Sequence, residues 1–136
     1  MKPNKIWPVK CTRDSFARAW VDLLSPYHKL TSREKDVAAR IINQHLKLKE
    51  SISDPEVLRD VLWSRSSRKD MMQSLGMSQA HFQMVLARLR EAEFLIDGDI
   101  NKKYLPGITE DTTYTIQVVF YWSDPKKEKR VDAKQA

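Results

Sequence analysis

A four-residue turn between two amphipathic segments constrains the fold of this chain more than any other feature. The turn is Leu75-Gly76-Met77-Ser78, in which Gly76 can adopt the left-handed conformation that ends a helix and Ser78 can cap the next one. Ser67 and Asp70 are expected to open the first helix. Because so short a turn makes consecutive helices cross steeply and presents the second one outward, the sequence predicts a helix-turn-helix. The second helix has one apolar face, formed by Phe82, Val85, Leu86 and Leu89.

The residues before the turn predict three more helices, the first of which is short and amphipathic. Thr12 or Asp14 can cap it. Ser25-Pro26 ends it, because the residue before a proline avoids helical geometry. Its inward-facing positions are expected to be Phe16, Ala17, Trp20, Leu23 and Leu24.

The other two helices have clear start signals. Thr31 and Glu34 can satisfy each other's free backbone donors in a capping box, and the helix that they start runs to about Lys49. Ser53-Asp54-Pro55-Glu56 starts the next helix, because proline suits the first helical turn, and Trp63 closes that helix against the core. The expected inward-facing positions are Val37, Ala38, Ile41, Ile42 and Leu46 in the longer helix, and Val57, Leu58, Val61 and Leu62 in the shorter.

After the helix-turn-helix, the pattern becomes that of a small β-sheet. From Phe94 to Ile100 the period is extended rather than helical, and Asp97-Gly98 is a strong hairpin signal. Thr113 to Trp122 alternates between two faces, as a half-buried strand does. One face of that strand carries Tyr114, Ile116, Val118, Phe120 and Trp122. The predicted fold class is therefore mainly α with a small antiparallel β-sheet.

The formal net charge of +6 is concentrated at the two ends of the chain. Residues 1–10 and 125–136 each carry +3, which leaves residues 11–124 formally neutral. A chain of 136 residues with 41% hydrophobic side chains can build one packed core. We therefore predict a single domain over 11–124, with a helical half at 11–63 and the helix-turn-helix with its strands at 65–122. The basic tails either hold a polyanion loosely or stay solvated.

Several classes of protein are disfavoured by what the sequence lacks. Cys11 is its only cysteine, so neither an intrachain disulfide nor a zinc site built from cysteines is expected. No apolar run approaches the roughly 20 residues that a membrane span needs, and we expect a cytoplasmic protein with no membrane partner. His28, His45 and His81 fall on three different predicted elements, and no phosphate loop or nucleophile elbow accompanies them. The sequence thus predicts a non-enzyme without cofactor or metal.

The turn and the segment after the second helix resemble the core of a winged helix-turn-helix domain. The resemblance rests on Leu75-Gly76-Met77-Ser78 and on Leu89-Arg90-Glu91-Ala92-Glu93-Phe94-Leu95-Ile96-Asp97-Gly98, and it covers about Arg65 to Trp122. In that superfamily such a turn leads into the recognition helix, and a leucine-rich stretch precedes the first strand of the wing. The resemblance implies a winged helix-turn-helix preceded by N-terminal helices.

The layout of the whole chain is also similar to small proteins of crAss-like tailed phages that infect Bacteroidetes. The cues are Phe16 to Trp20, Thr31 to Glu34, the helix-turn-helix and Ile100 to Pro106. This similarity implies a phage protein that acts in the host cytoplasm as a regulator, or in the virion.

A DNA-binding function requires polar side chains on base edges and basic ones on phosphates. The expected partner is double-stranded DNA. The predicted wing, Asp97 to Thr115, is less favourable because its net charge is −2. We expect Gln79, Gln83 and Arg88 to face the DNA groove, and Arg65, Arg68 and Lys69 to contact phosphate.

The competing hypothesis is a structural or connector protein that uses the same fold for contacts with an assembly partner or a second copy of the chain. The neutral body, an exposed Met84 and the aromatic strand ending at Trp122 are typical of a protein interface. Fold alone does not choose between the two functions.

Overall fold

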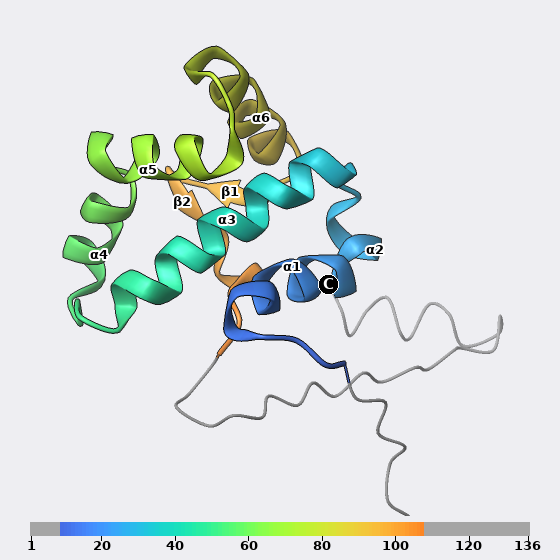
Figure 1. Cartoon of the computed structure of the whole chain (residues 1–136), viewed down its shortest axis with the longest axis horizontal. Coiled ribbons are helices and arrows are strands. Elements are labelled where there is room, and N and C mark those ends of the chain that lie inside the picture. Colours follow the sequence, from blue (N-terminus) through green and yellow to red (C-terminus); the bar gives the residue numbers. More distant parts are fainter. Residues whose placement is uncertain (1–8, 108–136) are drawn as a thin grey trace, which may run out of the picture. The chain divides into compact units, whose positions relative to one another are not determined.

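The computed structural model describes residues 9–107, which are mainly helical and carry a two-stranded antiparallel sheet. Figure 1 shows helix α3 crossing the middle of the molecule, and α1 packs along it. The coarse fold class predicted from the sequence is confirmed. The helices are α1 (Arg13–Leu23), α2 (Ser25–His28), α3 (Ser32–Lys49), α4 (Pro55–Leu62), α5 (Arg65–Leu75) and α6 (Gln79–Glu91), followed by β1 (Leu95–Ile96), β2 (Asp99–Ile100) and a 3-10 turn (Lys102–Tyr104).

Most helices begin where the sequence places a cap. Thr12 caps α1, and Asp54 caps α4 through two backbone N–H groups. At the start of α3 the Thr31 backbone N–H donates to Glu34 Oε1 at 3.0 Å, and the Glu34 N–H donates to Thr31 Oγ1 at 3.4 Å. Ser78 caps α6 by accepting from a backbone N–H of the first turn. These predicted helix starts are confirmed. They could be predicted because a cap is a contact between residues two or three positions apart.

The start of α5 differs from the prediction. Ser64 is the cap, because its Oγ accepts from the Ser67 N–H at 3.2 Å, and the helix begins at Arg65, before both Ser67 and Asp70. The Ser67 side chain instead faces the core, where its Oγ accepts from Gln44 Nε2 of α3 at 3.1 Å. A buried amide on a neighbouring helix therefore decides the role of Ser67.

Two predicted inward positions are also wrong. Leu23 is 49% exposed and Val57 is 47% exposed. Helix α4 packs through Leu58 and Leu62, which lie one turn apart, and this leaves Val57 on the solvent side. The predicted end of α1 at Ser25-Pro26 is confirmed, because the helix ends at Leu23. Pro26 then opens the single turn of α2, where its missing N–H is tolerated.

The core lies around α3 and joins it to α6 and to the segment after the hairpin. Trp20 of α1 donates its indole N–H to the Tyr104 carbonyl at 2.8 Å, and Phe94 stacks on the Tyr104 ring at a centroid distance of 5.4 Å. The end of the described chain is thus fixed against the first helix. The largest fully buried side chains are Phe82, Phe94, Ile41, Ile42, Leu62, Met71, Leu89, Val21 and Val37.

The helix-turn-helix turn has the predicted local geometry. Gly76 is left-handed with φ +64°, and the Met77 N–H donates to the Met72 carbonyl at 3.0 Å, which closes the end of α5. Helix α3 is hydrogen-bonded to this turn, because Arg33 Nη2 donates to the Leu75 carbonyl at 2.8 Å. The orientation of α6 is therefore set by α3 as well as by the turn.

The hairpin signal is confirmed. Asp97 and Gly98 have φ values of +54° and +75°, the left-handed pair that a two-residue hairpin turn of type I′ requires. Leu95 pairs with Ile100, and Ile96 pairs with Asp99. The predicted strand Thr113–Trp122, residues 1–8 and the basic segment 125–136 lie outside the described residues. None of the helices within residues 9–107 is long and apolar enough to cross a membrane.

Candidate nucleic-acid interface

An open groove of about 530 Å³ lies where the start of α5, one side of α6 and the hairpin meet. The three walls come from segments that are distant in sequence, and each contributes both apolar and polar side chains. The groove is lined by Trp63, Arg68, Gln83, Leu86, Arg90, Glu93, Leu95, Ile96, Asp97 and Gly98.

Hydrogen bonds fix the walls of this groove relative to one another. Arg68 Nε donates to the Trp63 carbonyl at 3.0 Å, which satisfies a backbone acceptor at the end of α4. The Trp63 indole N–H donates to Asp99 Oδ1 at 3.0 Å, so the aromatic ring is tied to β2. Arg59 of α4 donates to the Asp97 carbonyl at 2.6 Å and holds the hairpin turn. These contacts preorganise the groove, and no hydrogen bond within residues 9–107 uses the terminal nitrogens of Arg68.

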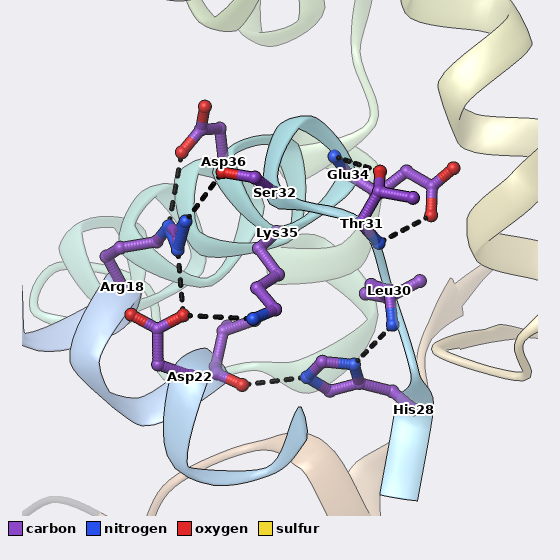
Figure 2. A network of polar contacts seen from close by, with 10 residues as sticks. Arg18, Asp22, His28, Leu30, Thr31, Ser32, Glu34, Lys35 and Asp36 are labelled. Atoms are coloured by element: carbon purple, nitrogen blue, oxygen red, sulfur yellow. Dashed lines mark hydrogen bonds and ion pairs between the residues drawn. The ribbon is translucent and has the colours of Figure 1, made fainter. Parts of the chain in front are cut away.

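The arginines of the described chain divide into two groups by their ion pairs. Five of them have a carboxylate partner within 4.0 Å: Arg13, Arg18, Arg33, Arg40 and Arg88. Figure 2 shows this arrangement between α1 and α3, where Arg18 bridges Asp22 and Asp36. The others are Arg59, Arg65, Arg68 and Arg90, and no carboxylate within residues 9–107 forms an ion pair with them. The arginines without an acidic partner thus all belong to α4, α5 and α6.

The structure brings only part of the predicted DNA-binding set together. Arg68 and Gln83 both line the groove. Arg65 and Lys69 are exposed on α5, one helical turn apart, and Gln79 is exposed at the first position of α6. All five lie on α5 or α6, and their contact with DNA stays a prediction.

Arg88 lies apart from this group. Its Nε is 3.3 Å from Glu34 Oε2 on α3, and its Nη1 is 3.9 Å from Glu91 Oε2. The pKa of Glu34 is lowered by the hydrogen bond from the Thr31 backbone N–H and by Arg88, so the carboxylate is charged at neutral pH. Arg88 therefore already has an anionic partner, and it is not among the residues that line the groove.

Arg90 is the basic residue of the groove that the predicted set lacks. Leu86 follows Gln83 by three residues and Arg90 follows Leu86 by four, so the three side chains share one side of α6. That helical spacing is present in the sequence and identifies Arg90 rather than Arg88 as the companion of Gln83.

The most outward part of α6 is apolar. Ala80 and Ala87 are exposed, and Met84 between them is 61% exposed. Few side chains on this part of the helix can make hydrogen bonds to base edges, which leaves that role to Gln79 and Gln83.

We expect His45 of α3 to make the stability of the fold depend on pH. Its Nδ1 is buried and has no hydrogen-bond partner within the described residues. Burial lowers the pKa of His45, an effect that the Asp99 carboxylate opposes and Lys49 reinforces. The unfolded chain binds a proton near pH 6.5 whereas the folded chain resists it, so we expect the free energy of unfolding to fall as the pH drops below about 6.5.

Urea unfolding of the wild type and of His45→Leu at pH 7.5 and pH 5.5 measures this effect. The loss of stability between the two pH values should be smaller in the variant, because the other titrating groups are shared. Glu34 contributes only below its ordinary pKa of 4.5, outside this window. An equal loss in both proteins would show that His45 is protonated as easily in the folded chain as in the unfolded one.

Comparison of the chain with protein-family models, with curated proteins and with solved structures finds no match.

Proposed function

We propose that this chain is a non-enzymatic, winged helix-turn-helix module that binds double-stranded DNA through α5 and α6. The observation that supports the proposal most is the placement of the arginines without an acidic partner. Arg65, Arg68 and Arg90 come from two helices that meet at the groove, while the arginines on α1 and α3 are neutralised by nearby carboxylates.

The two groups of arginines differ in the free energy that each side chain gains when it binds a phosphate. An arginine that already has a carboxylate partner must give up that interaction, whereas an unpaired one exchanges only water and counterions. Arg65, Arg68, Lys69 and Arg90 therefore gain more from a DNA backbone than Arg88, which is held by Glu34. In the proposed complex, Arg88 orients α6 against α3 instead of contacting DNA.

In this proposal, few side chains of the protein distinguish one DNA base from another. Gln79 and Gln83 are the amides on α6 that can make paired hydrogen bonds to adenine, and Ala80 and Met84 offer only apolar contact with a thymine methyl group. Most of the affinity then comes from phosphate contacts, and it should fall steeply with salt. The similarity of the layout to phage proteins supports a phage-encoded regulator as the biological setting.

Neutralising the unpaired cations should weaken duplex binding selectively. In the full chain, Arg65→Gln, Lys69→Gln and Arg90→Gln together remove three exposed charges that have no ion pair within the described region. The slope of log affinity against log salt should decrease by about 3, with weaker binding to duplexes of any sequence. Fluorescence anisotropy of a labelled duplex at several salt concentrations measures this.

The matched control is Lys10→Gln, Lys47→Gln and Lys49→Gln. These lysines are also exposed and without an ion pair in the described part of the chain, so the loss of net charge is the same. The control should keep most of the wild-type salt slope. Equal effects of the two triple variants would contradict the proposed interface, because only long-range attraction would then be involved.

The second candidate function is a structural or connector role in a virion or another assembly. The exposed Met84 between Ala80 and Ala87 favours it, since such an apolar patch on a presented helix is typical of protein contacts. If the wild-type chain shows no salt-dependent duplex binding, this role replaces the DNA-binding one.

A further inference from the structure

The floor of the groove is apolar although its rim is charged. Leu86 and Leu95 are almost fully buried, and Ile96 is 40% exposed at the hairpin. Trp63 closes one side, with its ring orientation fixed by the bond from its indole N–H to Asp99. An apolar surface between unpaired guanidinium groups favours a ligand that has both a flat apolar face and a negative charge.

We propose that this groove holds an unpaired nucleotide of the bound nucleic acid, with the base on the apolar floor and its phosphate on Arg68 and Arg90. This inference rests on the proposed function and specifies its substrate: DNA that combines a duplex with unpaired bases. In a continuous duplex the faces of the bases are stacked on each other and do not reach a protein surface, whereas an unpaired base offers one.

The polar groups of the groove are suited to bind the edge of one base, and they disfavour a second phosphate. Gln83 supplies an amide donor and acceptor for a base edge. Glu93 and Asp97 also line the groove and form no ion pair within residues 9–107, so they repel a further phosphate. Carboxylates accept hydrogen bonds from the amino groups of bases, which makes the hairpin end suitable for a base edge.

The test compares three labelled DNAs with the full chain at one salt concentration. The first is a blunt duplex, the second is the same duplex with a four-nucleotide overhang, and the third carries that overhang with abasic sites. The two overhangs have equal numbers of phosphates, so their difference measures the bases alone. We expect the overhang with bases to bind roughly tenfold tighter than the abasic one, as base stacking on a protein surface predicts.

Ile96→Ser tests whether the groove is the place where the base binds. The substitution leaves the charge unchanged and lies on an exposed position of the hairpin, and it should remove most of the preference for the overhang with bases. Leu23→Ser is the matched control, since Leu23 is 49% exposed on α1 and does not line the groove. It should leave the preference intact.

The outcomes separate the two proposals. Equal affinity for the two overhangs, with binding to the blunt duplex retained, would overturn the inference and leave duplex binding standing. A preference for bases that Ile96→Ser does not change would also overturn it, because the base would then bind elsewhere. Absence of binding to all three DNAs would contradict the proposed function and this inference with it.

Discussion

Replacing Phe82 with alanine is expected to lower the free energy of unfolding by about 3–5 kcal/mol. Phe82 is fully buried on α6, one turn after the Ser78 cap, and it belongs to the core that joins α6 to α3. The loss combines the transfer of the ring to water with the cavity that remains, since α3 and the hairpin restrict the collapse of the site. Urea unfolding followed by circular dichroism at 222 nm, a wavelength sensitive to helix, measures it.

Phe82→Leu provides the graded control for this prediction. Leucine keeps most of the apolar volume and the helix propensity, so the cost should be well below that of alanine. A loss below about 1 kcal/mol for Phe82→Ala would contradict the packing of α6 described above, because a side chain that leaves no cavity is not part of a close-packed core.

Replacing His28 with alanine should cost about 3 kcal/mol of unfolding free energy. Its side chain is 4% exposed and joins α1 to the start of α3: Nε2 donates to the Val21 carbonyl at 2.7 Å, and Nδ1 accepts from the Leu30 N–H at 3.0 Å (Figure 2). Alanine would leave a backbone donor and a backbone acceptor buried without partners, each of which costs roughly 1–3 kcal/mol. Urea unfolding at pH 7.5 measures the difference.

His81→Ala is the matched control for His28. His81 lies in the first turn of α6 and is only partly buried, and its side chain forms no hydrogen bond within the described part of the chain. Its removal should change the free energy of unfolding by about 0.5 kcal/mol or less. Similar losses for both histidines would show that the bridge through His28 contributes little.

Most of the helix starts, and both turns, could be predicted because they depend on neighbours in sequence. The capping box of Thr31 and Glu34, the left-handed Gly76 and the Asp97-Gly98 hairpin turn each involve contacts within a few residues. Their conformations follow from backbone sterics and local hydrogen bonds, which are the same in any fold.

The burial of side chains and their contacts with other helices could not be predicted as accurately as the helix starts and turns. Ser67 is a core residue that hydrogen-bonds to Gln44 of α3, and no helix or strand within residues 9–107 covers Leu23 or Val57. These outcomes depend on which helix faces each position, and the hydrophobic pattern of a single segment does not contain that information.

In the candidate interface, too, the local features could be predicted from the sequence and the long-range contacts could not. The sequence by itself determined the two helices, their turn and the polar residues that α5 and α6 offer, including Arg68 and Gln83. Only the tertiary structure decided that Arg88 meets Glu34 while Arg90 joins the groove with the hairpin. The physical reason is that the charge of an arginine is fixed by its chemistry, whereas its availability depends on carboxylates that are distant in sequence and close in space.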